Sequence, residues 1–469
     1  MIPLTVCANQ NLAVFGLGLS GIAAVQALAK GGASVTAWDD SEAARAGAAA
    51  KGVQVSAPED WDWSSLHALV LSPGVPLTHP KPHPVVARAR AAGVEIIGDT
   101  ELFCRERRHR GMPGKVAAIT GTNGKSTTAA LTAHLLGAAG RDAALGGNIG
   151  KAVLDMPELD AGRHYVLEYS SFQIDLTPGL DADVAALLNV QPDHLDRHGT
   201  LENYAAIKAR IFNRLSGEQC GIIGCDSDVT RRLAESWPFA VARQAVSTAQ
   251  SVRDGVYVRD GLLFEARDGI VEAPVSLRGI PALRGVHNWE NAAAAYAAAR
   301  ALGLTREEII EGLRSFPGLA HRMEEVGRLG RVAFINDSKA TNADAAARAL
   351  ACFDPVFWIV GGQPKEGGLA GLEPYYNRVA KAYLIGEAAE EFAHQLEGEV
   401  PYEHCGTLAN AVEAASRDAL RASGREPVVL LSPACASYDQ FADFTVRGET
   451  FRQLVAAHEG VSMREAIAA

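Results

Sequence analysis

The chain has 469 residues, which is too long for one compact core and predicts two or three domains. Its 44 Lys and Arg against 55 Asp and Glu give a formal net charge of −11, which argues against a general attraction to nucleic acid or to an anionic membrane. The N-terminus lacks a basic segment followed by an apolar one, and nowhere do eighteen apolar residues run together, so we expect a cytoplasmic protein. The seven cysteines are scattered without CxxC spacing and are expected to be reduced core residues.

The first hundred residues alternate short β-type runs with alanine-rich helical stretches, which predicts a parallel sheet with crossover helices. A basic segment follows at 104–115, and we interpret it as a solvated linker between two domains. The β-type runs of this first region lie at 12–16, 34–40, 68–74 and 94–99, and its helices at about 20–30 and 85–93.

Two further α/β regions follow the basic segment. Residues 252–277 alternate polar with apolar side chains and contain DG turns, so antiparallel hairpins are expected beside the second sheet. A helix is expected over 284–303, before the third region begins. The β-type runs lie at 115–121, 165–171, 184–190 and 220–226 in the second region, and at 331–338, 355–362, 381–387 and 427–434 in the third.

The expected fold class is therefore α/β with three domains. Rossmann-like parallel sheets at the two ends would flank a central P-loop ATPase domain that has an added antiparallel hairpin region. The expected domains cover residues 1–110, 111–318 and 319–469.

The stretch "VAAITGTNGKST" has the features of a phosphate-binding loop. An apolar strand ends at Ile119, a glycine-rich turn follows, and Lys125 opens a helix. A phosphate in such a turn meets backbone N–H groups, the positive end of the helix and the lysine ammonium, while a hydroxyl reaches Mg²⁺. The loop is a shortened TGxxGKST form of the usual pattern, and it predicts ATP binding. Its predicted ATP-binding residues are Gly121, Thr122, Asn123, Gly124, Lys125, Ser126 and Thr127.

A second glycine turn, "GLGLSG", follows the first strand and spells GxGxxG at Gly16, Gly18 and Gly21. Asp39 ends the next strand, where the acid of a dinucleotide site binds ribose. The residues alone leave three interpretations open: a site for NAD, a site for another diphosphate such as a UDP-linked substrate, and a purely structural turn.

Five stretches together resemble the Mur ligase family: "AITGTNGKST", "GGNIG", "LEYSSFQI", "NDSKATN" and "LSPACASYDQF". The likeness runs from the N-terminal glycine turn to the end of the third region. It implies ATP-dependent ligation of D-glutamate to UDP-N-acetylmuramoyl-L-alanine through an acyl phosphate, in the synthesis of the peptidoglycan precursor and hence in cell shape and division. Another Mur ligase or folylpolyglutamate synthase is the nearest alternative, and an NAD-dependent oxidoreductase is the alternative from a different class. A monomer is expected.

The resemblance also assigns the catalytic centre, where two Mg²⁺ ions are implied. Glu168 and Ser126 would share one ion with ATP, and His194 would serve the second ion and the reacting carboxylate. Lys208 would carry a carbamate formed with CO₂, and Lys339 would neutralise the reacting oxygens. From composition alone, Glu168 is equally a surface acid, His194 a capping or surface histidine, and Lys208 a solvated helical lysine.

The remaining assignments from the resemblance concern the nucleotide and the two substrates. Adenine, ribose and phosphate contacts fall on Asn288, Asn291, Asp337 and Arg322. The UDP-linked substrate would contact Gly16, Gly18, Leu19, Ser20, Asp39, Gly74, Asn148 and His194. D-Glutamate would contact Thr341, Lys365, Ser437 and Phe444. The chain departs from the family at Asp40 and Ser41, where some relatives place a hydroxyl and an arginine near the uracil nucleotide, so the recognition of uridine is not defined by these residues.

Overall fold

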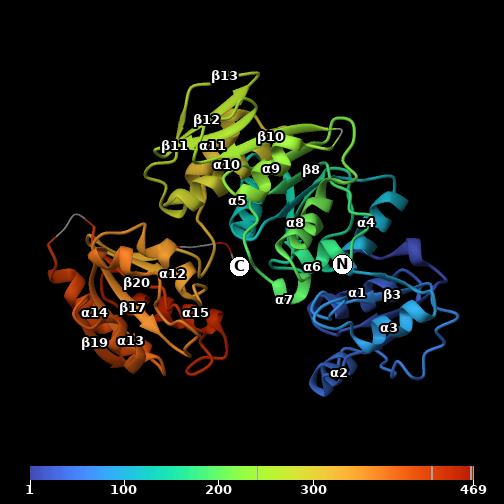
Figure 1. Cartoon of the computed structure of the whole chain (residues 1–469), viewed down its shortest axis with the longest axis horizontal. Coiled ribbons are helices and arrows are strands. Elements are labelled where there is room, and N and C mark those ends of the chain that lie inside the picture. The colour runs from blue at the N-terminus through green and yellow to red at the C-terminus, as the bar shows by residue number, and fades with distance from the viewer. Residues whose placement is uncertain (240, 424–425, 465–466, 468–469) are drawn as a thin grey trace. The chain divides into compact units, whose positions relative to one another are not determined.

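A computed structural model describes residues 1–239, 241–423, 426–464 and 467. The chain forms two compact units, Met1–Leu277 with Trp289–Ser315 and Arg278–Asn288 with Phe316–Ala469. Each unit is described separately below, and Figure 1 labels the elements. Within the described residues, no helix combines the length and the apolar character needed to cross a bilayer.

The first unit begins with a four-stranded parallel sheet in the order β2-β1-β3-β4, as the alternating pattern predicts. Apolar residues fill these strands, and β3 is buried along its whole length, as expected for a sheet covered on both faces. The strands are β1 Asn11–Phe15, β2 Ser34–Trp38, β3 Ala68–Leu71 and β4 Glu95–Ile97, and the helices are α1 Leu19–Lys30, α2 Glu42–Ala49, α3 Pro84–Ala91 and α4 Asp99–His109, after the short η1 Thr5–Cys7.

The interpretation of 104–115 as a solvated linker is wrong, because half of this segment, residues 104–109, belongs to α4. Acidic residues in its first turn and basic residues in its last turn complement the helix dipole. Arg107 is buried at 1% exposure, and its guanidinium pairs with Asp181 at 3.2 Å and with Asp183 at 2.7 Å. Arg107 is thus a buried joint whose acidic partners lie more than seventy residues away in the sequence.

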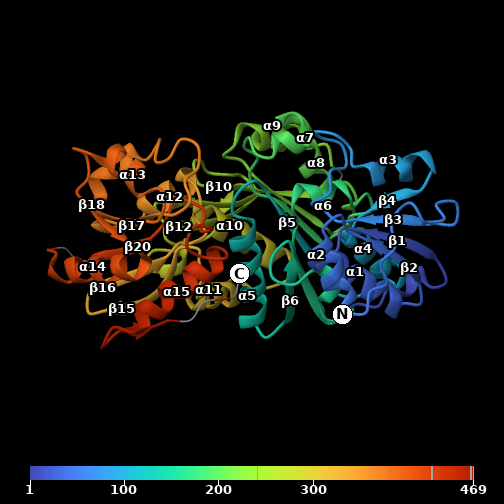
Figure 2. The same ribbon diagram turned by 90° about the horizontal axis from the view of Figure 1, so that it is seen from below.

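The second sheet of this unit has ten strands in the order β13-β12-β11-β10-β9-β8-β5-β7-β6, with β14 paired to β12. The strands from β6 to β11 run parallel, and β12 starts the expected antiparallel hairpins. Helix α5 packs on β6 and β7, and Figure 2 shows it beside this sheet. The strands are β5 Lys115–Thr120, β6 Asp142–Gly147, β7 Arg163–Glu168, β8 Val184–Leu187, β9 Cys220–Gly224, β10 Ala242–Ser247, β11 Gly255–Arg259, β12 Leu262–Arg267, β13 Ile270–Val271 and β14 Val275–Ser276.

Several helices accompany this sheet. They are α5 Lys125–Ala138, α6 Ser171–Asp175, α7 Leu195–His198, α8 Leu201–Ala209, α9 Asp228–Ser236, α10 Val286–Ala301 and α11 Arg306–Ser315, with 3₁₀ turns η2 Val153–Asp155 and η3 Arg210–Phe212. The 3₁₀ turn η4 Pro281–Leu283 and the first residues of α10 belong to the second unit.

The second unit contains a seven-stranded sheet in the order β19-β18-β17-β20-β16-β15-β21. Its central strands are parallel and fully buried, and β15 and β21 add an antiparallel edge. The strands are β15 Glu324–Leu329, β16 Val332–Asn336, β17 Val356–Gly361, β18 Val379–Ile385, β19 Tyr402–Gly406, β20 Val428–Leu431 and β21 Ser462–Met463. The helices are α12 Ala343–Leu350, α13 Ala389–Leu396, α14 Leu408–Arg421 and α15 Phe444–Ala456, with η5 Glu373–Arg378.

The seven cysteines are free thiols, six of them buried and Cys352 partly buried, as the scattered spacing predicts.

Candidate active site

The phosphate loop spans the turn between β5 and α5, as the sequence predicts. Gly124 precedes the helix with φ of +83°, in the left-handed region. A Cβ added there would lie 2.1 Å from the Asn291 side-chain oxygen, so only glycine fits this position. Asn291 also accepts a hydrogen bond from the Thr128 hydroxyl at 3.3 Å, and thereby holds α10 against the start of α5.

A second loop, which follows β8, holds the phosphate loop in place. The Thr122 N–H donates to the Asn189 carbonyl, and the Asn123 N–H donates to the Asn189 side-chain oxygen, both at 2.9 Å. The Asn123 side chain donates to Gln191 at 3.0 Å. These bonds fix the loop backbone before any ligand binds, which is the preorganisation that a phosphate site requires.

Lys125 lies within the loop that it follows. Its ammonium donates to the carbonyl oxygens of Gly121 at 2.9 Å and Thr122 at 2.8 Å. Ser126 and Thr127 stand next to it in the first turn of α5, where the helix N-terminus favours negative charge.

Lys208 is buried at 1% exposure, so the expectation of a solvated helical lysine is wrong. Its amine donates to the Gly121 carbonyl at 2.8 Å and to the Thr120 hydroxyl at 3.3 Å, and it lies over the Tyr204 ring. Burial, followed by the charge of Lys125, lowers the pKa of Lys208 to about 7, although Asp193 and Glu168 oppose the shift. A large fraction of this amine is therefore neutral near neutral pH.

Glu168 ends β7 beside the phosphate loop, and Ile119 is its register partner on β5. It is 2% exposed, so the surface-acid interpretation is wrong. Its Oε1 accepts a bond from the Asn148 side chain at 2.9 Å, while its Oε2 is buried without a hydrogen-bond partner. A buried carboxylate oxygen in this state fits a metal ligand, because a cation would satisfy it.

His194 is the N-cap of the short helix α7, with φ of +51°. Its half-exposed ring lies 5.0 Å from the Phe172 ring and 3.5 Å from the Asp193 carboxylate. The neighbouring His198 is buried, stacks on Phe172 at 5.2 Å and bonds the Ser171 hydroxyl at 2.9 Å. Burial lowers the pKa of His198, which marks it as a packed neutral ring.

In the parts of the chain that the structure describes, no group of three or more His, Cys, Asp or Glu is placed to hold a metal ion. The donors predicted for the ion are the Glu168 carboxylate, the His194 ring and the Ser126 hydroxyl. A carbamate on Lys208 would add anionic oxygens of the type that Mg²⁺ prefers, so the residues present fit the ion once that lysine is modified.

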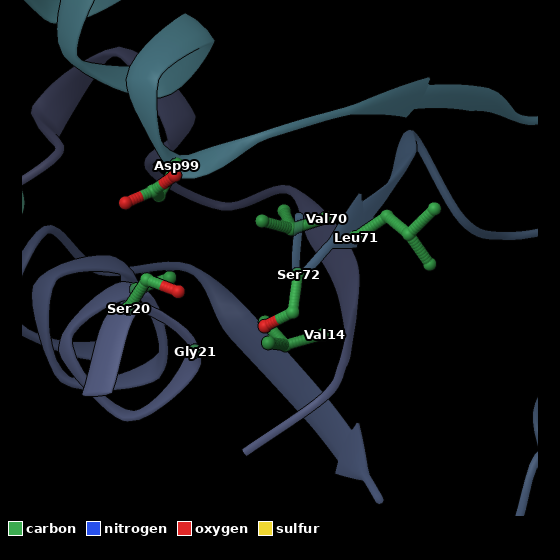
Figure 3. A pocket seen from close by; sticks show the side chains of 8 residues that line it. Val14, Ser20, Gly21, Val70, Leu71, Ser72 and Asp99 are labelled. Carbon is green, nitrogen blue, oxygen red and sulfur yellow. The ribbon is translucent and has the colours of Figure 1, made fainter. Parts of the chain in front are cut away.

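The N-terminal glycine turn is held from two sides. Gly16 has φ of +95°, and the Ser72 hydroxyl donates to its carbonyl at 2.9 Å. Asp39 accepts the Leu17 N–H at 2.6 Å and the Ser41 N–H at 2.8 Å, so its carboxylate braces the turn. The three polar side chains Ser20, Ser72 and Asp99 line a small pocket behind the turn (Figure 3).

The start of α1 leaves room for a ligand. Leu19 is 78% exposed, and a Cβ added at Gly18 or at Gly74 would meet nothing within 4 Å. These positions border the turn on its open side.

Arg45 supplies a cation close to the departure at Asp40 and Ser41. It donates to the Asp39 and Asp40 carbonyls at 2.7 and 2.8 Å and stacks on Trp38 at 4.4 Å. The Asp40 carboxylate pairs with His83 at 2.8 Å. The sequence analysis missed this arginine because it stands on the first helical turn after Ser41 and not beside the strand end.

In the second unit, Asp337 is buried at the end of β16. Its carboxylate accepts the Met323 N–H at 3.1 Å and the Ser432 hydroxyl at 2.9 Å. Burial raises its pKa to about 7, and Arg322 partly offsets the shift, so these two predicted ATP contacts lie within electrostatic reach of each other. Asn288 is buried and donates to the Arg284 carbonyl at 2.9 Å, which is a local contact within its own segment.

The four positions assigned to D-glutamate lie on loops that follow β16, β17 and β20 and at the start of α15. Lys339, beside Thr341, places its ammonium 3.8 Å from the centre of the Phe444 ring. Ser437 is 3% exposed, whereas Lys365 is exposed on its loop. Loops at the carboxyl ends of parallel strands are the usual place for ligands in open α/β sheets.

A strand, a glycine-rich turn and a helix, with a buried carboxylate at the end of the adjacent strand, define an α/β protein that binds nucleotide phosphates. Three family models match the chain: "Mur ligase MurD-like, N-terminal domain" at residues 10–98, "Mur ligase middle domain" at 119–299 and "Mur ligase, glutamate ligase domain" at 321–435. The chain belongs to the Mur ligase family. Members of this family are ATP-dependent, amide-bond-forming ligases that use Mg²⁺.

Curated relatives match nearly the whole chain. The UDP-N-acetylmuramoylalanine–D-glutamate ligase of Chelativorans sp. (strain BNC1) is 54% identical over 464 residues, 99% of each chain. The enzyme of the same name from Rhizobium meliloti (strain 1021) is 52% identical over 464 residues, 99% of this chain and 100% of the relative.

Solved structures support the same architecture. UDP-N-acetylmuramate-alanine ligase MurC from Thermotoga maritima aligns with a TM-score of 0.57 at 16% identity, over 95% of this chain and 98% of that one. A UDP-N-acetylmuramoyl-L-alanyl-D-glutamate–2,6-diaminopimelate ligase aligns with a TM-score of 0.57 at 20% identity, over 98% of this chain and 95% of that one. At these identities the likeness shows the fold alone, and it confirms the expected three-domain α/β class.

Proposed function

We propose that this chain joins D-glutamate to UDP-N-acetylmuramoyl-L-alanine at the expense of ATP. The observation that carries the proposal is the phosphate loop, around which Lys125, Lys208 and Glu168 gather. The chain is also 54% identical, over 99% of its length, to a relative named UDP-N-acetylmuramoylalanine–D-glutamate ligase. The substrate's L-alanyl carboxylate attacks the γ-phosphorus of ATP, ADP leaves, and an acyl phosphate forms. The D-glutamate amine then attacks the acyl carbon, phosphate departs, and the nitrogen loses a proton to give the amide.

Charge repulsion is the main barrier to the first step. A carboxylate about 4 Å from each phosphate charge meets roughly 4 kcal/mol of repulsion per pair at an effective dielectric near 20. Lys125, at the start of α5, faces the β- and γ-phosphates in this proposal, and Lys339 faces the reacting oxygens. Cations in a site closed to water stabilise the transition state more than they would in solution.

Two Mg²⁺ ions are proposed. Glu168, Ser126 and ATP oxygens would hold one, and His194 with a carbamate on Lys208 would hold the other. Bound Mg²⁺ neutralises phosphate charge and orients the oxygens that it touches. The buried Oε2 of Glu168 supports the first assignment, and the depressed pKa of Lys208 supports the second, because CO₂ adds only to a neutral amine.

The glycine turn of the first sheet is proposed to hold the diphosphate of the UDP-linked substrate. Backbone N–H groups at the start of α1 and the helix dipole suit an anion, and the bracing by Asp39 keeps the turn open. Asn148 would contact the sugar-linked part while it orients Glu168. The proposed contacts are Gly16, Gly18, Leu19, Ser20, Asp39, Gly74, Asn148 and His194.

The remaining proposed contacts are those to the nucleotide and to the amino acid. Asn288 and Asn291 would face adenine, Asp337 would accept ribose hydroxyls, and Arg322 would reach the phosphates. D-Glutamate presents two carboxylates and needs compact donors, which we assign to Thr341, Lys365, Ser437 and Phe444 with its backbone. Closure of residues 319–469 over ATP would complete the site.

We also propose that the protein is a cytoplasmic monomer with domains at residues 1–110, 111–318 and 319–469. Sedimentation of the purified chain tests the monomer, and expression of each segment alone tests the boundaries.

One experiment tests the reaction itself. The purified chain is given ATP, Mg²⁺, UDP-N-acetylmuramoyl-L-alanine labelled with ¹⁸O in its carboxylate, and a panel of amino acids. Phosphate release that requires both the nucleotide substrate and D-glutamate, with one ¹⁸O in the phosphate, is the expected result. Phosphate release with another amino acid would indicate a different Mur ligase activity. Phosphate without ¹⁸O would contradict the acyl-phosphate intermediate.

A further inference from the structure

Arg447 lies on the second turn of α15 and is buried at 1% exposure. Its guanidinium donates to the Ser338 hydroxyl at 3.0 Å, the Ser338 carbonyl at 2.9 Å, the Cys435 carbonyl at 3.1 Å and the Ala436 carbonyl at 3.2 Å. Every one of these acceptors is neutral. Among the described residues no carboxylate lies within ion-pair distance of it, and Asp439 acts on it only through a longer-range attraction.

The four bonds join the loops that surround the proposed amino-acid pocket. Ser338 begins the loop that continues to Lys339 and Thr341, and its hydroxyl also donates to the Phe444 carbonyl at 2.8 Å. Cys435 and Ala436 immediately precede Ser437. One guanidinium therefore fixes the loop after β16, the loop after β20 and the first turn of α15 relative to one another.

The loop after β17, which carries Lys365, rests on the same group. Gly362 has φ of +135°, and a Cβ there would lie 2.4 Å from the Ala436 carbonyl oxygen and 3.2 Å from an Arg447 Nη atom. The Gln363 N–H donates to the Ala436 carbonyl at 3.0 Å. All four positions proposed for D-glutamate thus stand on segments that meet at Arg447.

Burial of an uncompensated cation is unfavourable. If Arg447 only donated hydrogen bonds to three carbonyls, a neutral donor would suffice. No protein carboxylate among the described residues pairs with Arg447, and a substrate with two carboxylates would supply the negative charge. Burial lowers the pKa of Arg447 to about 10, which still leaves the guanidinium charged at neutral pH.

We propose that Arg447 is a positioning residue for the amino-acid substrate: it holds the strand-end loops in register and gives the pocket a positive charge that selects a dicarboxylic amino acid. The inference rests on the proposed function. It adds a residue that touches the loops and not the reacting atoms.

The test compares Arg447→Met and Arg447→Lys with Arg452→Lys on the same helix. Arg452 pairs with Glu324 at 2.6 Å and, among the residues that the structure describes, has no hydrogen bond or ion pair to the three loops, so it is the matched control. Steady-state kinetics are measured for each of the three substrates, together with the thermal midpoint. Arg447→Met is expected to raise KM for D-glutamate at least about tenfold, while KM for ATP and KM for the UDP-linked substrate change by less than about threefold. Arg447→Lys keeps the charge and is expected to show a smaller increase in KM for D-glutamate.

A lowered thermal midpoint with an unchanged KM for D-glutamate in Arg447→Met would overturn the inference, because it would show that Arg447 only holds the loops together. If Arg447→Met fails to fold, Arg447→Gln decides, because glutamine removes the charge and keeps a hydrogen-bond donor: inhibition by glutarate weakened relative to inhibition by D-glutamine supports the charge role, and equal weakening of both overturns it. If the wild-type protein does not consume D-glutamate, the proposed function is wrong. If the wild type turns over normally and the Arg447 variants keep its KM for D-glutamate, only this inference is wrong.

Discussion

The Lys208 amine donates to the Gly121 carbonyl at 2.8 Å, so a helix that follows β8 reaches directly into the phosphate loop after β5. The contact buries a lysine beside another lysine, Lys125, and lowers its pKa to about 7. A lysine in this state is a nucleophile toward CO₂ as well as a cation.

The first prediction concerns the carbamate on Lys208. Lys208→Ala and Lys208→Arg are both expected to lower kcat at least about 100-fold, because neither side chain can form a carbamate and the proposed metal ligand would be lost. Added acetate or propionate should restore part of the activity of Lys208→Ala, where the cavity admits a carboxylate, and none of that of Lys208→Arg. Near-normal turnover by Lys208→Arg would contradict the carbamate, since arginine keeps only the charge.

The second prediction concerns Glu168. Glu168→Gln keeps the shape and the bond from Asn148 but removes the charge at Oε2, so kcat is expected to fall on the order of 100-fold or more. The Mg²⁺ concentration at half-maximal rate should rise as well. Glu158→Gln, at an exposed acid paired with Lys30, is the control and should change neither quantity. An unaltered Mg²⁺ titration in Glu168→Gln would remove this residue from the metal site.

The third prediction concerns the backbone of the phosphate loop. Gly124→Ala would place a methyl group against the Asn291 amide at a positive φ, so we expect loss of ATP turnover and a lower thermal midpoint. Gly137→Ala on the same helix meets nothing within 4 Å and should stabilise the fold by about 0.5–1 kcal/mol, with kinetics unchanged. Normal ATP kinetics in Gly124→Ala would show that the loop adopts another conformation.

Local patterns predicted the parts of this protein whose partners are close in sequence. The phosphate loop was predicted correctly because strand, glycine, lysine and hydroxyl stand within twelve residues of one another. The basic segment at 104–115 was misinterpreted because the acids that pair with Arg107 lie in the distant segment just before β8. Lys208 and Arg447 carry no local signal, since their burial depends on loops brought together only by the sheets. A resemblance to a family identified Lys208, but only the folded structure identifies Arg447.

The last prediction concerns Asp99, whose carboxylate is buried with Oδ1 lacking a hydrogen-bond partner in the pocket of Figure 3. Burial raises its pKa from 3.8 to about 6, opposed by its backbone hydrogen bonds. Between these two values the folded state binds more protons than the unfolded state, so this group's contribution to stability falls as pH rises from about 4 to 6 and stays low above that.

Asp99→Asn removes this titration, and its stability relative to wild type should therefore increase between pH 5 and pH 7.5. The full shift corresponds to an order of 2–3 kcal/mol. Thermal midpoints of both proteins at the two pH values measure the effect. Asp62→Asn is the control, because hydrogen bonds from Ser64 and Ser65 lower the pKa of that exposed carboxyl and its titration has the opposite sign. An Asp99→Asn difference that is the same at both pH values would show that Asp99 ionises as freely in the folded chain as in the unfolded one.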